Sequence, residues 1–368
     1  MSERRVSLIV PSILIAVAIL SGAGRSCEAD FTTIINVPPD PMPTSIGSHT
    51  QLNVYEGAML FHGFEAGAAD GSSVDVEVNI YGSIAEPDNT PRLIAYPGSV
   101  INMHAPVEGT GYSWITADGS VFNMHGGVIY FFGAGNSTEV NIFEGTIWNM
   151  GAHSGSTVNQ MGGAVLSDFS GLGGEGSVWN LYDGQIGNRF EMSDGAVMNM
   201  YGGQIGYRFS VGDGATMNIF GGTISLGPDT SRDYAFIAQS DSTVNIHGGL
   251  FLENILGVEG SRFNLFVREL SLDGVPVPLV PGVQTLIPNS EGVLLEAILA
   301  DGTFLDLGLG RGRPGIDDFR DGVIFTATLV PEPSTLVLAL LAAVGLIAIR
   351  SRRRGVDLHA SRQTRSWE

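Results

Sequence analysis

The stretch VMNMYGGQIGYRFSV, residues 197–211, holds the pattern that decides the fold. An Asn stands between two apolar residues, an aromatic residue and two glycines follow, and a second run with alternating apolar residues completes the unit. Alternation with a period of two is typical of β-strands, and glycine supplies the backbone freedom that tight turns need. The stretch therefore predicts a strand, a corner and a second strand.

The same unit recurs along the body of the chain. Its Asn occupies eleven positions, 18–27 residues apart: Asn53, Asn79, Asn102, Asn123, Asn141, Asn159, Asn180, Asn199, Asn218, Asn245 and Asn264. A period near 19 residues is too short for a propeller blade or a helical repeat, and it fits one coil of a β-solenoid. We expect an all-β chain with a right-handed parallel β-helix of about ten coils over residues 51–268.

The alternation also assigns a direction to each side chain. The residues that flank each Asn are nearly always apolar and should fill the interior, so that the Asn and the ring two residues later face outward. Successive coils would then form an Asn ladder beside an aromatic column that includes Tyr182, Tyr201 and Phe220. Either the rings stabilise the solenoid by stacking, or they bind polysaccharide by stacking on sugar rings. An inward-facing Asn ladder is the structural alternative.

The corners and the column bear on metal binding. Acid-Gly pairs such as Asp118-Gly119 stand upstream of many Asn residues and supply the positive φ of a tight corner. Calcium at these corners is left open, but the Gly-Gly-x-Gly-x-Asp roll signature is missing. His104, His125 and His247 share their column with Tyr and Phe, which argues against metal ligation. No metal site and no cofactor are therefore expected.

Composition restricts the class of protein. The chain has 51 Gly and only 15% charged residues, which argues against an ordinary helical or α/β domain. All 18 basic residues are Arg, and the body carries 34 acids against nine Arg, a net charge of about −25. Such a surface argues against nucleic acid as a partner. The single Cys27 excludes a disulfide within the chain.

The beginning of the chain has the layout of a secretory signal peptide. Arg4 and Arg5 precede an apolar run over residues 8–20, and small residues follow up to a cleavage site near Ala29. Thirteen apolar residues are too few to span about 30 Å of hydrocarbon. We assign residues 1–29 to the signal peptide and 30–50 to a Pro-rich lead-in.

The far end of the chain carries three parts in order. They are the triplet Pro331, Glu332 and Pro333, an apolar run over residues 336–349, and the basic cluster Arg350, Arg352, Arg353 and Arg354. This order resembles the PEP-CTERM sorting signal over residues 331–354. The resemblance implies that an exosortase-type protease recognises the triplet, cleaves nearby, and releases or transfers the protein to the outside of the envelope.

The apolar run is marginal as a permanent anchor. Fourteen residues give a hydrophobic helix of about 21 Å at 1.5 Å per residue, and the Arg cluster should hold its end in the cytoplasm. We therefore expect a transmembrane stage at the inner membrane that is transient. A basic tail, residues 355–368, continues beyond the point where the family usually ends.

Residues 269–330 lose the Asn repeat and read as alternating strands, so we expect a β-rich cap over the last coil. Arg189 and Arg208 occur in matching contexts nineteen residues apart and should be neighbours on adjacent coils, with Glu191 and Asp213 balancing their charge. The acidic pair Asp317-Asp318 lies in a loop rich in Gly and Arg. We expect both carboxylates to be exposed to solvent there and not to act in acid-base catalysis.

Three functions remain open. The main expectation is a non-catalytic structural or adhesive protein, exported to the cell surface or the extracellular matrix, with the export machinery and an exosortase-like protease as partners. The first alternative is a polysaccharide-binding solenoid that uses the outward rings. The second is a divergent β-helix polysaccharide lyase or hydrolase, although lyases rely on Lys or Arg with calcium and this chain has no Lys.

Overall fold

The computed structural model describes residues 30–60, 63–84, 93–104, 114–166, 171–193, 195–225, 236–252, 254–310 and 317–330. These residues form strands and turns with no helix among them, and none of their segments could cross a membrane as a helix. The predicted signal peptide, the sorting triplet, the apolar run, the Arg cluster and the basic tail lie outside the described residues.

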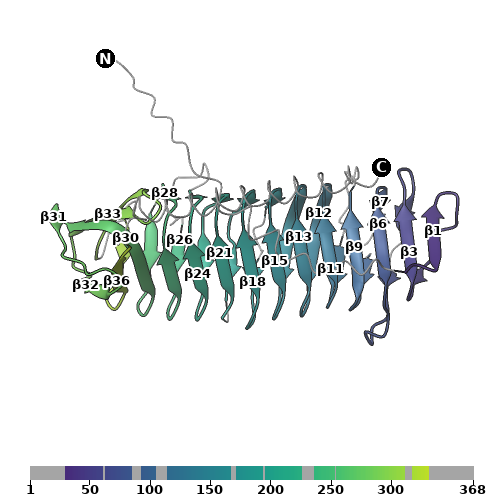
Figure 1. Ribbon diagram of the computed structural model, residues 1–368, viewed down its shortest axis with the longest axis horizontal. Coiled ribbons are helices and arrows are strands. Elements are labelled where there is room, and N and C mark those ends of the chain that lie inside the picture. Colours follow the sequence, from purple (N-terminus) through teal and green to yellow (C-terminus); the bar gives the residue numbers. More distant parts are fainter. Residues whose placement is uncertain are drawn as a thin grey trace, which may run out of the picture.

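The body is a parallel β-solenoid of about ten turns, with its coils side by side along one axis (Figure 1). One face is a long sheet in which each strand pairs with the equivalent strand of the next coil. Its parallel strands are β1 Thr33–Val37, β3 Thr50–Val54, β6 Val76–Ile80, β9 Ser99–Met103, β11 Val121–Met124, β13 Glu139–Ile142, β15 Thr157–Gln160, β18 Val178–Leu181, β21 Val197–Met200, β24 Thr216–Ile219, β27 Thr243–Ile246, β30 Arg262–Leu272 and β36 Ile324–Leu329. We call this the ladder face. The right-handed sense of the coil stays a prediction.

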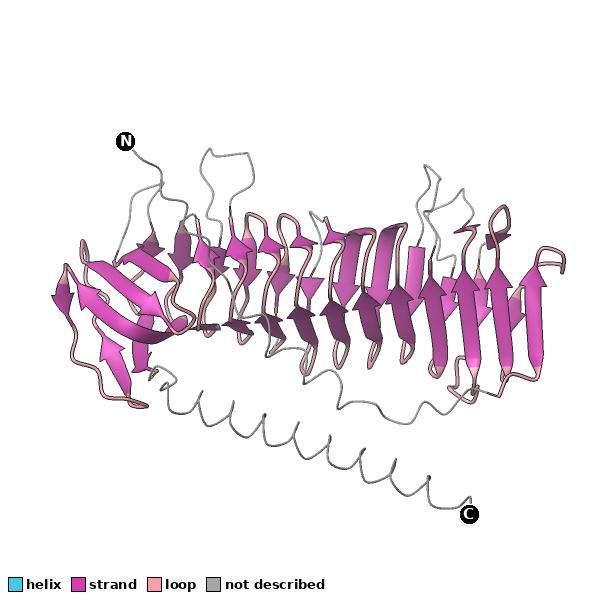
Figure 2. Cartoon of the chain, turned by 45° about the horizontal axis from the view of Figure 1, so that its top comes forward, coloured by secondary structure: helices cyan, strands magenta, loops and turns pink. Residues whose placement is uncertain are grey.

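Two narrower columns of strands complete each coil (Figure 2). The second face holds β4 Met59–Leu60, β7 Ser83–Ile84, β16 Ala164–Val165, β19 Gln185–Ile186, β22 Gln204–Ile205, β25 Thr223–Ile224 and β28 Leu250–Phe251. The third face holds β2 Ser45–Ile46, β5 Phe64–Ala66, β8 Leu93–Ala95, β10 Trp114–Ala117, β17 Gly171–Leu172, β20 Glu191–Met192, β23 Phe209–Val211, β26 Phe236–Ala238, β29 Ile255–Gly257 and β35 Asp318–Phe319. The long strands β12 Val128–Ala134 and β14 Thr146–Ala152 run through both columns.

The interior follows the predicted alternation. On β21 the flanking residues Met198 and Met200 are fully buried, while Asn199 between them is only partly covered. The third face contributes its own buried rings, and Phe190 stacks on Phe209 with centroids 5.4 Å apart. A core that repeats coil by coil removes apolar surface from water along the whole axis, at roughly 25 cal/mol per Å².

The corner before the ladder face has a constant backbone form. A residue with positive φ stands four positions before each ladder Asn from Asn53 to Asn264, and it is usually glycine. Where glycine is absent the chain uses residues that tolerate this region, such as Asp75 with φ 52° and Asp241 with φ 55°. The predicted acid-Gly corners therefore form as positive-φ turns.

The first coil begins within the segment that the sequence assigns to a lead-in. Strand β1 pairs in parallel with β3, so the ladder face starts at Thr33. The outer edge of β1 is partly closed by Asp40, whose carboxylate accepts the N–H of Asn36 at 2.9 Å and whose own N–H donates to the Asn36 carbonyl at 2.8 Å. These bonds occupy backbone groups that an open edge would offer to another strand.

The last coil adjoins antiparallel strands at the other end of the rod (Figure 1). Strand β30 continues beyond the coil and pairs with β33 Leu294–Leu299, which in turn pairs with β34 Phe304–Gly308. Strands β31 Val275–Pro276 and β32 Gln284–Ile287 lie against β30 and β36 respectively. Strand β36 returns parallel to β30 and ends the described chain beside it.

The corner after the aromatic column gives a test of close coil packing. Gly184 has φ +92°, and a Cβ there would lie 2.5 Å from the carbonyl oxygen of Gly163 on the preceding coil. Gly57 occupies the same corner in the second coil, after β3, with φ +82° and nothing within 4 Å of the position that a Cβ would take. We expect Gly57→Ala to cost about 1 kcal/mol from the backbone alone.

Gly184→Ala should lower stability clearly more than Gly57→Ala, because a backbone atom cannot move aside. Thermal unfolding followed by circular dichroism compares the two variants with the unchanged chain. Equal shifts in Tm would contradict the close approach of adjacent coils at this corner.

Candidate functional site

The Asn side chains form one continuous hydrogen-bonded ladder on the outer surface of the ladder face. Each Nδ2 donates to the Oδ1 of the Asn on the preceding coil, at distances of 2.7–3.0 Å. The register is Asn to Asn at every step from Asn36 to Asn264. This geometry excludes the inward-facing alternative.

The ladder is longer than the repeat in the sequence indicates. It begins at Asn36, one coil earlier than predicted, and Asn36 Oδ1 also accepts the Tyr55 hydroxyl at 3.3 Å. At the other end Thr326 takes the position of the next Asn, and its hydroxyl donates to Asn264 Oδ1 at 2.8 Å. Gln284 donates to the Thr326 hydroxyl at 2.8 Å and so covers the final rung.

The ring column beside the ladder consists of two stacks. One is Tyr55, Tyr81, His104, His125 and Phe143, and the other is Tyr182, Tyr201, Phe220, His247 and Phe266. Met161 occupies the intervening coil. Centroids lie 3.8–5.9 Å apart with interplanar angles of 2–22°, so neighbouring rings cover one another's faces.

This stacking limits what the column can bind. Tyr201 and Phe220 keep 37% and 38% of their surface exposed, but a ring between two neighbours exposes its edge while its faces stay covered. A sugar that stacks on an aromatic ring needs an open face. The predicted residues Tyr182, Tyr201 and Phe220 are therefore brought together, in an arrangement that suits stabilisation of the solenoid.

Burial changes the titration of the column. It lowers the pKa of His247, which lies between Phe220 and Phe266. Burial also lowers the pKa of His104, with a further contribution from the charge of the stacked His125. The pKa of Tyr182 is raised by burial and then by Tyr201. The column thus favours uncharged rings.

An interior Asn of the ladder gives a test of the hydrogen bonds between the side-chain amides. Asn180 donates to Asn159 and accepts from Asn199, so Asn180→Ala removes two bonds worth about 0.5–1.5 kcal/mol each. We expect the urea midpoint of Asn180→Ala to fall further than that of the end-rung control Asn36→Ala, which breaks one ladder hydrogen bond and the longer, exposed bond from the Tyr55 hydroxyl. Equal shifts would contradict a ladder contribution to stability.

The buried imidazole predicts a pH dependence. Because the folded pKa of His247 lies below its ordinary value of 6.5, the unfolded chain takes up a proton first, and stability is lost as the pH falls from about 6.5 toward the folded pKa. His247→Phe should therefore lose less Tm between pH 8 and pH 5.5 than the unchanged chain. The control Phe220→Tyr should keep the original pH dependence, and an equal loss in His247→Phe would contradict the effect.

A groove of about 910 Å³ crosses the third face. The pairings align Gly151 of β14, Gly171 of β17 and Glu191 of β20 on neighbouring coils. The polar side chains in its lining are Asn136, His153, Ser154, Arg189, Glu191 and Ser193. No sequence motif marks this groove, because its residues come from separate coils. The alignment of glycines at matching strand positions was the available signal.

Arg189 and Arg208 lie at equivalent corners, as predicted. Both have positive φ, 56° and 60°, and the Arg189 N–H donates to the Tyr207 carbonyl at 3.0 Å. Arg189 shares the groove with Glu191, one of its two predicted charge partners. The arrangement places one cation and one anion in the same groove.

Asp317 differs from the predicted solvated loop acid. Its two carboxylate oxygens accept the N–H groups of Ile255 at 2.9 Å and Gly308 at 3.1 Å, which joins the last coil to β34. Burial raises the pKa of Asp317, although the two N–H bonds act in the opposite direction. The Gly- and Arg-rich sequence around this residue gives no sign of its burial.

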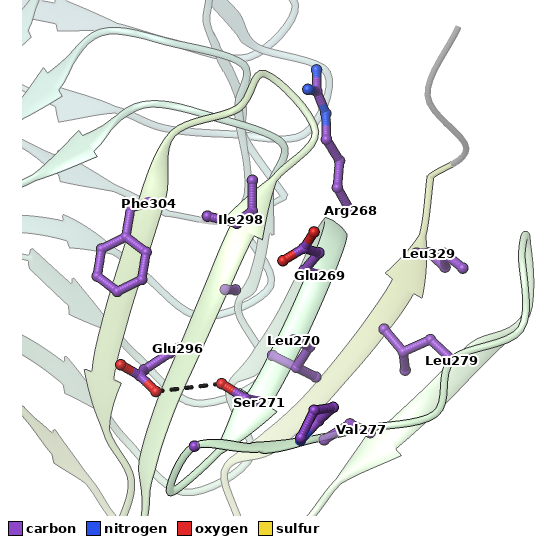
Figure 3. Close-up of a pocket in the computed structure, with 13 residues that line it drawn as sticks. Arg268, Glu269, Leu270, Ser271, Val277, Leu279, Glu296, Ile298, Phe304 and Leu329 are labelled. Carbon is purple, nitrogen blue, oxygen red and sulfur yellow. Dashed lines mark hydrogen bonds between the residues drawn. The ribbon is translucent and has the colours of Figure 1, made fainter. Parts of the chain in front are cut away.

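A second cavity, of about 620 Å³, lies among the terminal strands (Figure 3). Leu270, Val277, Leu279 and Leu329 form much of its apolar lining, and Glu296 accepts a bond from the Ser271 hydroxyl at 3.3 Å on its polar side. The cavity therefore opens beside the point where β36 leads toward the predicted sorting triplet. Among the described residues, no group of three or more His, Cys, Asp or Glu gathers to hold a metal ion.

Comparison with known proteins bears on the far end of the chain. Neither the curated proteins nor the solved structures include a match to this chain. The family model described as the PEP-CTERM protein-sorting motif matches residues 329–354. Residues 329–354 therefore carry a PEP-CTERM sorting motif. This motif implies that the chain, whose body is a β-solenoid, is exported and sorted by an exosortase-type enzyme.

Proposed function

We propose that this chain is a non-catalytic structural or adhesive protein of the cell surface or extracellular matrix. The observation that carries this proposal is the unbroken ladder from Asn36 to Asn264, because side-chain bonds between all successive coils make a long, stiff rod. The sorting motif supplies a route by which such a rod reaches the envelope exterior.

Both ends of the rod support a role as a separate unit. Asp40 occupies backbone groups at the outer edge of β1, and we propose that the antiparallel strands β31–β34 cap the last coil. Covered ends prevent solenoids from adding to one another in an uncontrolled way. The acidic surface adds a repulsion that keeps rods soluble.

The route to the surface includes a transient membrane stage. The apolar run 336–349, followed by Arg350, Arg352, Arg353 and Arg354, would hold the chain at the inner membrane until an exosortase-type enzyme acts at the triplet. The mature rod would then remain at the envelope surface or be secreted.

Two alternatives differ in what the rod does after export. Polysaccharide binding through Tyr182, Tyr201 and Phe220 requires open ring faces, whereas Tyr201 and Phe220 have rings on both sides and Tyr182 has a ring on one side. A divergent lyase or hydrolase would release unsaturated or reducing ends from a polysaccharide, which colorimetric assays detect directly. The structural or adhesive role requires no such turnover.

The sorting triplet gives the test of the proposed route. Replacing Pro331, Glu332 and Pro333 together by Ala removes the motif that the processing enzyme is proposed to recognise. We expect the variant to keep its C-terminal segment, with a higher intact mass, and to accumulate in the membrane fraction. Ser334→Ala is the matched control and should be processed normally. Normal processing of the triple variant would overturn the proposed route.

A further inference from the structure

We propose that the groove on the third face binds a segment of neutral polysaccharide. This inference rests on the surface location given under Proposed function, and it assigns the glycan contact to the third face in place of the ring column. The groove of about 910 Å³ lies near the top of the range of roughly 300–1,000 Å³ that is usual for ligand sites.

Gly151 is the first reason. It lies inside the seven-residue strand β14, where glycine weakens a strand by roughly 0.5–1 kcal/mol relative to Ala. Its backbone does not require glycine, because φ is not positive and a Cβ would meet only His153 Nε2, at 3.7 Å. Glycine inside a strand marks a bulge, a tight bend, or a place where a ligand or another backbone approaches closely. Gly151 pairs regularly with Gly133 and Gly171, which argues against a bulge and leaves close approach of a ligand as the reading that the proposal uses. The missing side chain keeps the floor of the groove open.

The polar lining is the second reason. Asn136 and Ser193 each carry both hydrogen-bond donors and acceptors, while Arg189 adds donors and Glu191 adds acceptors. The Ser154 hydroxyl donates to the Glu175 carbonyl at 2.7 Å and so contributes only an acceptor. This mixture matches hydroxyl groups, which donate and accept at the same atom. It does not match phosphate or sulfate, which favour clustered cations.

The charge of the groove selects among glycans. Arg189 and Glu191 cancel, so the lining has no net charge with His153 neutral, whereas the body of the chain carries about −25. A polyanion would be repelled by the surrounding surface. A neutral chain meets no such penalty, and the open groove crosses several coils, which suits a polymer that continues beyond the site.

The same strand carries an exposed aromatic side chain. Trp148 is 46% exposed and precedes Gly151 by three residues on β14, where this strand passes from the second face to the third face. It stacks on Tyr130 with centroids 6.3 Å apart, farther than any neighbouring pair of the ring column. Trp148 is outside the groove lining, but it offers exposed apolar surface on a strand that contributes to the groove, a combination that suits sugar rings.

The experiment measures binding of the full-length chain, in mild detergent, to dextran, laminarin and hydroxyethyl cellulose by affinity electrophoresis, with alginate and polygalacturonate as anionic comparators. We expect binding to at least one neutral glycan and to neither polyanion. Gly151→Leu should reduce that binding at least tenfold, because the new side chain occupies the floor, while circular dichroism and Tm show that it folds. Glu191→Gln should weaken binding without filling the groove.

Two further variants distinguish the groove from the neighbouring surface and from the ring column. Thr116→Leu changes the same outward strand position two coils before Gly151, outside the groove lining, and should bind normally. Tyr182→Ala with Tyr201→Ala removes rings of the column and should also bind normally. Absence of neutral-glycan binding, preference for a polyanion, unchanged binding of folded Gly151→Leu, or loss of binding only in the double Tyr variant would each overturn this proposal. None of these outcomes affects the triplet test of surface sorting.

Discussion

The hydrogen bond between the side-chain amides of ladder Asn residues on successive coils is the interaction on which the architecture depends. Backbone pairing alone would allow neighbouring coils to slip, and a slip of one residue would bury every polar side chain of a strand and expose its core residues. The amide ladder penalises that error at each coil. Extra residues are therefore accommodated between strands: in the longest coil, from Asn218 to Asn245, they lie between β25 and β26.

The fold was predictable because its signal repeats. Met198, Asn199 and Met200 show the same alternation as the equivalent residues of nine other coils, with Gln160 as the polar exception in the tenth, and this periodicity indicates both the strand and its buried face. The ends were harder, since they lack parts of the repeat. Asn36 is followed by prolines in place of a ring and paired glycines, and Thr326 replaces Asn altogether.

The groove and the half-buried Asp317 could not be predicted in the same way. Gly151, Gly171 and Glu191 are about twenty residues apart and become neighbours only when the third face has formed. Asp317 is half-buried, and its carboxylate accepts two N–H groups from separate elements, those of Ile255 and Gly308. Neither property follows from local sequence, because each depends on which coil lies next to which.

Charge placement on the ladder face follows the same coil-by-coil logic. Two positions before the ladder Asn, Glu77 and Glu139 are separated by Val100 and Val121, so no two acids of that column are direct neighbours. Like charges directly opposite one another destabilise paired strands. The coils of a chain with about twice as many acids as bases can therefore stack closely, provided that each column of side chains separates its charges.

The direction of the hydrogen bonds between the Asn side chains has a consequence for how such a chain evolves. Every coil presents the same acceptor to the next coil and the same donor to the one before it. Duplication or deletion of one whole unit in the gene would therefore leave no unmatched amide, and it would alter the reach of the rod by about 4.8 Å. Length becomes a trait that can vary in small, equal steps while the two ends of the molecule stay unchanged.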